Sequence, residues 1–122
     1  MKVQEEILGC FDAWNRALQS GDPGEVAKLY AADAILLPTV SNAVRHNFAE
    51  IRDYFAHFME SHPSGRIDEP NVRVYGDLAI NSGVYTFSFP DKSPIQGRFT
   101  FVYRKNGQRW EIVEHHSSRM PE

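Results

Sequence analysis

Two polar patterns in the second half of the sequence carry the side chains best suited to ligand chemistry, and the first is in segment 96–104. Arg98 and Thr100 alternate there with aromatic residues, so on a strand they would share one face of a sheet. An arginine inside a cavity binds a carboxylate through two parallel hydrogen bonds. Two interpretations of Arg98 stay open: it lines a pocket for an anionic ligand, or it lies at the rim, solvated or in an ion pair.

The second pattern is the adjacent pair His115-His116, and it does not indicate a metal site. Neighbouring residues of a strand point to opposite faces, so the two imidazoles cannot bind one ion together. His57 and His62 are also poorly spaced as ligands. We expect no metal and no cofactor. One histidine of the pair is expected in or near a cavity, and the other at an interface.

Acid–base chemistry would need an acid beside His115, and the sequence offers only distant candidates. Asp12 and Asp53 could converge on His115, as a dehydratase requires, if the helices orient them so. Asp12 is expected to face outward, because it follows a residue of an apolar stripe. Cys10 adjoins the same stripe, and we expect a buried, inert thiol there.

The first half of the chain predicts the helices that must position these side chains. Apolar residues recur every three or four positions over 3–18, which is typical of an amphipathic helix, and Gly21 can end it. The expected elements that follow are a capped helix over 22–30, a buried strand at 34–37 and a capped helix over 47–59. Trp14 and Tyr54 lie on these helices and are expected in the core, where helical aromatics can also wall a cavity.

The second half predicts β-structure. Strands are expected at 72–75, 78–89, 98–104 and 110–118, with Gly83 as a bulge or bend and Asn106-Gly107 as a hairpin turn. Helices followed by consecutive strands predict an α+β domain over 1–122, in which three N-terminal helices pack in one strongly curved antiparallel sheet.

Aromatic rows on the long strands predict self-association. Only one face of a single sheet can cover the helices, so the other aromatic row is expected to meet a partner. A homodimer is the simplest solution. The predicted interface residues are Tyr85, Phe87, Phe99, Phe101, Tyr103 and His116.

Composition narrows the function classes. The chain has 122 residues, with 13 Lys and Arg against 16 Asp and Glu, so it lacks the basic excess of a general nucleic-acid binder. No apolar run approaches the ~20 residues of a membrane span, and the acidic start is unlike a signal peptide. A single cysteine excludes an intramolecular disulfide, and a cytoplasmic location is expected.

The element order resembles the cone-shaped fold named after nuclear transport factor 2 (NTF2-like). Within it, segment 105–121, with its Gly107 turn, Trp110-x-Ile112-Val113 and a histidine-containing end, resembles the final hairpin of the association (hub) domain of calcium/calmodulin-dependent protein kinase II. Segments 37–47 and 54–55 fit the same family in the same order. The resemblance looks nearest to stand-alone bacterial members. The sequence has no Gly-rich loop or His-Arg-Asp triplet, so no kinase activity is expected.

The resemblance implies a pocket between the concave sheet face and the helices that binds small carboxylates. Two family arginines fall on Thr100 and Ser117 here, which leaves Arg98 as the substitute cation. A dimer is implied, or a larger ring as in kinase hubs. An alternative is an isomerase, dehydratase or hydrolase of the SnoaL-like or ketosteroid-isomerase-like type, although the steroid-isomerase base falls on Leu37. The sequence leaves open which sheet face lines the cavity. The pocket candidates are Arg98, Thr100, His115, Ser117, Trp14 and Tyr54.

Overall fold

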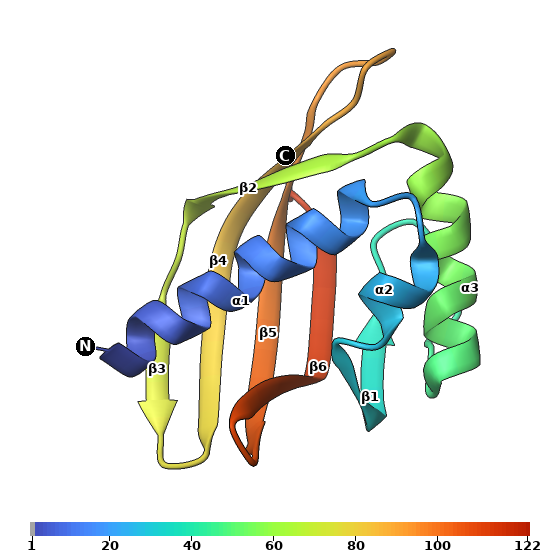
Figure 1. Cartoon of the computed structure of the whole chain (residues 1–122). Coiled ribbons are helices and arrows are strands. Elements are labelled where there is room, and N and C mark those ends of the chain that lie inside the picture. Colours follow the sequence, from blue (N-terminus) through green and yellow to red (C-terminus); the bar gives the residue numbers. More distant parts are fainter. Residues whose placement is uncertain (1) are drawn as a thin grey trace.

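Three helices lie against one face of a twisted six-stranded sheet in the computed structural model, which describes residues 2–122 (Figure 1). The helices are α1 (Lys2–Gln19), α2 (Pro23–Ala27) and α3 (Phe48–Phe58), and a 3-10 turn, η1 (Met59–Ser61), continues α3. The strands are β1 (Tyr30–Leu37), β2 (Ser64–Glu69), β3 (Val72–Tyr75), β4 (Leu78–Ser88), β5 (Ile95–Asn106) and β6 (Arg109–Arg119). The α+β class and the cone-like arrangement are confirmed. No helix among residues 2–122 is long and apolar enough to cross a membrane.

The strand order is β1-β6-β5-β4-β2, and β3 also pairs with β4. Every pair is antiparallel except β1 with β6, which run parallel. The expectation of a purely antiparallel sheet is therefore wrong at one edge. This edge pairs the first strand of the sequence, β1, with the last, β6.

The helix boundaries follow the capping residues. Ile7, Phe11, Trp14 and Leu18 form the buried stripe of α1, and Gly21 takes a φ of +85° after it. The Asp22 carboxylate accepts a hydrogen bond from the Gly24 N–H at 2.9 Å, and Asn47 accepts one from the Glu50 N–H at 2.9 Å. The second helix is shorter than predicted, because it ends at Ala27 and Tyr30 already begins β1.

Strand β2 was not predicted from the sequence. Its residues, Ser-Gly-Arg-Ile-Asp-Glu, include a single apolar side chain, so no alternating pattern marks it. The strand is held instead by its backbone pairing with residues 84–88 of β4. The Gly65 N–H donates to the Asn15 side-chain oxygen on α1 at 2.8 Å.

Gly83 is a point of close backbone approach and not a bulge in the pairing of β4 with β5, whose register runs continuously through it. A Cβ at Gly83 would lie 1.8 Å from the Glu69 carbonyl oxygen. The register shifts elsewhere, on β2 between Ile67 and Glu69 and on β6 between the partners of Val102 and Tyr103. The shift on β6 affects the inner face. It leaves Val113 unpaired and brings Ile112 and His115 onto the same inner face, where both are buried.

Both aromatic rows point to the same, helix-covered face of the sheet. Tyr85 lies opposite Gly97 and Phe99 lies opposite Gly83, so each large ring occupies the space above a glycine of the neighbouring strand. Five of the six predicted interface residues are therefore core residues, and that part of the prediction is wrong. They are Tyr85, Phe87, Phe99, Phe101 and Tyr103, all at most 9% exposed.

Candidate functional site

A cavity of about 50 Å³ opens into the core between the sheet and the helices. We call it the inner cavity. Its buried lining includes Trp14, Tyr54, Phe55, Tyr85, Phe87, His115 and Ser117, and its more exposed lining includes Thr39, Val40, Gln96 and Arg119. A water molecule needs about 10–15 Å³ of such space, so only a few non-hydrogen atoms of a ligand fit here.

A wider surface hollow of about 430 Å³ adjoins the inner cavity, and we call it the outer chamber. The two spaces share Val40, Tyr54, Phe58, Phe89 and Ile95 as lining residues. The outer chamber adds three basic side chains, which are those of Arg45, His57 and Lys92. A ligand longer than the inner cavity would extend toward these side chains.

A chain of hydrogen bonds runs along the inner cavity. The Trp14 indole N–H donates to the Tyr30 hydroxyl at 3.1 Å, and that hydroxyl lies 2.8 Å from His115 Nδ1. His115 Nε2 lies 3.3 Å from the Tyr85 hydroxyl, and Tyr85 lies 2.5 Å from Ser117 Oγ. Residues from α1, β1, β4 and β6 thus hold one polar line through an aromatic core.

The series of hydrogen bonds ends at a fourth hydroxyl, that of Thr39, whose Oγ1 lies 2.5 Å from Ser117 Oγ. Thr39 follows Pro38 in the loop after β1, and both residues line the inner cavity. The polar line therefore begins at a buried indole and ends at two hydroxyls beside the space that a ligand would fill.

His115 is neutral in this environment. Burial lowers the pKa of its imidazole to about 3, and the charge of the adjacent His116 adds to the effect. The ring also stacks on Phe101 with centroids 4.0 Å apart. Burial likewise raises the pKa of Tyr54 to about 12 and that of Tyr85 further. The inner cavity is consequently lined by uncharged groups near neutral pH, with Arg119 as the exception.

Four of the six predicted pocket residues line the inner cavity: Trp14, Tyr54, His115 and Ser117. The other two do not. Arg98 is exposed on the opposite face of β5, and Thr100 shares that outer face, because the odd-numbered residues 97–103 are the buried ones. Placing Arg98 or Thr100 in the cavity is therefore wrong. His116 is also exposed on the outer face, opposite Thr100.

Three site residues were missed from the sequence, and one of them, Arg119, had a readable signal. Arg119 continues the inward series 115, 117, 119 of β6 and supplies the cation that was sought at Arg98. Tyr30 was assigned to a helix face, and only its true place at the start of β1 brings it to His115. Thr39 lies in a loop, where no periodicity indicates direction.

The acidic partners considered for His115 lie elsewhere. Asp12 is exposed on α1, as expected. Asp53 is exposed on α3 and forms an ion pair with Arg45 at 3.0 Å. No Asp or Glu of residues 2–122 lines the inner cavity, so the pairing of His115 with an acid is wrong. Burial, with the charge of Glu6 next, raises the pKa of Cys10 to about 11, which disfavours a thiolate nucleophile.

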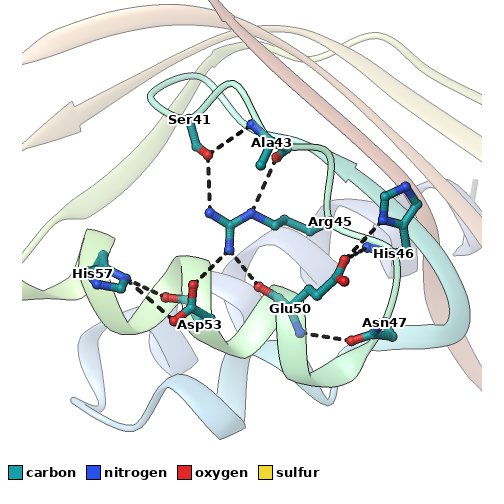
Figure 2. Close-up of polar contacts among 8 residues, drawn as sticks. All are labelled: Ser41, Ala43, Arg45, His46, Asn47, Glu50, Asp53 and His57. Carbon is teal, nitrogen blue, oxygen red and sulfur yellow. Dashed lines mark hydrogen bonds and ion pairs between the residues drawn. The ribbon is translucent and has the colours of Figure 1, made fainter.

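Arg45 holds the loop that forms one wall of the outer chamber (Figure 2). Its guanidinium donates to the Glu50 carbonyl and the Asp53 carboxylate, each at 3.0 Å, and to Ser41 Oγ at 3.1 Å. Its Nε–H donates to the Ala43 carbonyl at 3.3 Å. With four partners occupied, Arg45 joins the loop to α3. It has less capacity than Arg119 to bind a ligand.

No group of three or more His, Cys, Asp or Glu side chains within residues 2–122 is arranged to hold a metal ion.

A cone of three helices and a curved sheet, with an aromatic cavity at its centre, defines a protein of the NTF2-like, cystatin-like fold. The sequence model of the calcium/calmodulin dependent protein kinase II association domain matches residues 3–121. The chain therefore belongs to that association-domain family.

Solved structures agree with this assignment. A Xanthomonas campestris protein provisionally named as the same association domain is 48% identical, with a TM-score of 0.92 over 96% of this chain and 87% of that one. An NTF2-like protein of unknown function from Pseudomonas putida KT2440 is 19% identical, with a TM-score of 0.84 over 96% and 86% of the two chains. The comparison with curated proteins gave no match.

One further structure shares the fold at low identity. An NTF2-like protein from Streptomyces avermitilis, given a provisional dehydratase name, is 18% identical, with a TM-score of 0.83 over 99% of this chain and 98% of that one. At that identity the likeness concerns the fold, and function has to be argued from the site.

Proposed function

We propose that this chain is a self-associating association-domain protein that holds a small anionic organic ligand in its cone and has no kinase activity of its own. The observation that carries the ligand half is the lining of the inner cavity. Aromatic walls, a neutral His115 and hydroxyl groups surround the space, and Arg119 supplies one cation beside it. This combination suits a carboxylate attached to a short apolar body.

Binding without turnover is the better account of this lining. Proton-transfer chemistry needs a group that changes its protonation state near the working pH. His115 has a pKa of about 3 and both of its ring nitrogens contact tyrosine hydroxyls. These contacts suit a histidine that orders its neighbours and keeps one protonation state.

Self-association is proposed through the outer face of the sheet, since the helices cover only the other face (Figure 1). Half-buried Ile80, Val84 and Val102 lie on this face among polar residues that include Thr100 and His116. Membership of the association-domain family supports pairing of copies. We place the protein in the cytoplasm on the strength of its single cysteine.

Pentanoate is the probe for the ligand half, followed by two-dimensional NMR of the labelled protein. We expect shifts at Trp14, His115 and Ser117, and an affinity at least about threefold weaker in R119Q, which removes a charge-assisted contact. R98Q is the matched control, because it removes an arginine from the opposite face of the sheet. No shifts with pentanoate, or equal losses in the two variants, would contradict the proposal.

Light scattering after size-exclusion chromatography tests the assembly half. At micromolar concentration we expect at least twice the mass of one chain. A single-chain mass under those conditions rejects self-association and leaves the ligand half to be judged by the NMR titration.

A further inference from the structure

The hydrogen bonds along the inner cavity have a fixed direction, because one end of the chain is a group that only donates. An indole N–H has no acceptor capacity, so the Tyr30 oxygen accepts from Trp14. The Tyr30 hydroxyl proton is buried and needs an acceptor, and His115 Nδ1 at 2.8 Å is the acceptor in reach. A neutral imidazole that accepts at Nδ1 carries its proton on Nε2.

The same reasoning sets the direction of the remaining hydrogen bonds, from His115 to Thr39. His115 Nε2–H donates to the Tyr85 oxygen, which leaves the Tyr85 hydroxyl proton to be donated to Ser117 Oγ. Ser117 and Thr39 have one hydrogen bond between them and two hydroxyl protons. Whichever residue donates in that bond, one hydroxyl proton of the pair has no acceptor within this series of hydrogen bonds.

We infer that the inner end of the bound ligand is an uncharged group with a hydrogen-bond-accepting oxygen, such as a ketone carbonyl, which takes the spare proton of the Ser117–Thr39 pair. This rests on the proposed function and specifies its ligand as a short oxo acid. Both hydroxyls line the inner cavity. About 50 Å³ of space accommodates an end group such as an acetyl and excludes a large one.

The position of Arg119 fits this ligand. Arg119 lies two residues beyond Ser117 on β6 and faces the same cavity. Residues two apart on a strand are separated by about 7 Å. A carboxylate at the guanidinium and a carbonyl at the hydroxyl pair would therefore belong to one small molecule whose oxygens are several bonds apart.

Three acids that differ at one carbon separate the possibilities: 4-oxopentanoate, pentanoate and 4-ammoniopentanoate. Their affinities are read from NMR shifts of the Ser117 and Thr39 amides and the Trp14 indole N–H, with the Trp110 indole, which donates to Glu6 near the surface, as an internal reference. One neutral hydrogen bond predicts that 4-oxopentanoate binds about two- to tenfold more tightly than pentanoate. The ammonium acid, which can only donate, is expected to bind most weakly.

Two variants test which residues cause the binding of the acids and the preference for the oxo acid. R119Q should weaken the binding of all three acids by a similar factor and leave their ratios unchanged. T39V should also keep the preference for the oxo acid, because Ser117 then retains its own proton for the ligand. Equal binding of 4-oxopentanoate and pentanoate, or tighter binding of the ammonium acid, would overturn the inference.

The neutral ketone 2-pentanone distinguishes failure of the inference from failure of the proposed function. If no acid binds but the ketone shifts the Ser117 and Thr39 signals, the proposal of an anionic ligand is wrong. The inference of a hydrogen-bond-accepting group at the inner end of the ligand is then supported. If the acids bind without discrimination, the proposed function stands and the inference fails. If neither the acids nor the ketone bind, both are rejected.

Discussion

His115 shows how a single titratable residue can be given one protonation state. Its two ring nitrogens lie between tyrosine hydroxyls, its plane stacks on Phe101, and no carboxylate of residues 2–122 lines the cavity beside it. This environment disfavours the protonated, charged form of the imidazole. The sequence analysis named His115 as the pocket candidate and His116 as the interface candidate, but it did not show the bulge at Val113, which brings His115 onto the inner face.

The neutral state of His115 predicts a pH-dependent stability. Below its ordinary pKa of about 6.5 the unfolded chain takes up a proton at this residue, while the folded chain does so only near pH 3. Stability should therefore fall as pH falls from 6.5, by up to about 1.4 kcal/mol per pH unit from this group. Urea unfolding between pH 7 and 5 measures the slope, above the range in which carboxylates protonate.

The matched pair for this prediction is H115Q and H116Q. H115Q removes the buried imidazole, so the slope should largely disappear even if the variant is less stable at pH 7. H116Q changes an exposed neighbour and should keep the slope. A wild-type slope that persists in H115Q would show that another group causes it.

At the scale of elements, sequence periodicity predicted α1, α3 and the three long antiparallel strands, since each buries one face in a regular alternation. It failed where tertiary contacts override local pattern. Strand β2 is polar and is held by pairing with β4. Gly83 is required by the close approach of the Glu69 backbone, which no local pattern reveals. The same limit explains why Arg98 was selected and Arg119 was missed: the inward face of β5 is set by packing on the helices.

G83A is expected to be severely destabilising. The added Cβ would lie 1.8 Å from the Glu69 carbonyl oxygen, which is backbone and cannot rotate away. We expect a loss of more than about 3 kcal/mol in unfolding free energy, or no soluble folded protein. G9A is the control, because a Cβ there meets no atom within 4 Å on exposed α1 and should stabilise by about 0.5–1 kcal/mol. A G83A variant as stable as wild type would show that the end of β2 does not approach β4 as closely as described.

The loop between β1 and α3 depends on Arg45. Lysine keeps the charge but cannot reach four partners in a plane, so R45K should cost about 1–3 kcal/mol and release the loop. Hydrogen–deuterium exchange over 39–46 should accelerate, while the rest of the chain changes little. R52K, on an exposed part of α3, is the matched control. Unchanged exchange in R45K would mean that the loop is held by other contacts.

At the scale of the whole molecule, the apolar content was expected to be divided between a core and an interface. Both aromatic rows belong to the core, so each chain buries its largest side chains by itself. What remains for a partner is the outer face of β4, β5 and β6, which mixes aliphatic and polar residues. An association through such a face would join chains that are already folded, and substitutions there should separate assembly from folding.

V102K tests that separation. Val102 is half-buried on the outer face, with Ile80 and Glu114 as its neighbours on the adjoining strands. In a separate chain the new ammonium group lies opposite the Glu114 carboxylate, so folding should be nearly unaffected. At a sheet-to-sheet interface it would lose water, and self-association should weaken at least about tenfold. L8K adds the same charge to an exposed position of α1 and should leave the assembly intact. Light scattering over a concentration series compares the three proteins, and if V102K assembles like wild type while L8K does not, the interface lies on the helical side.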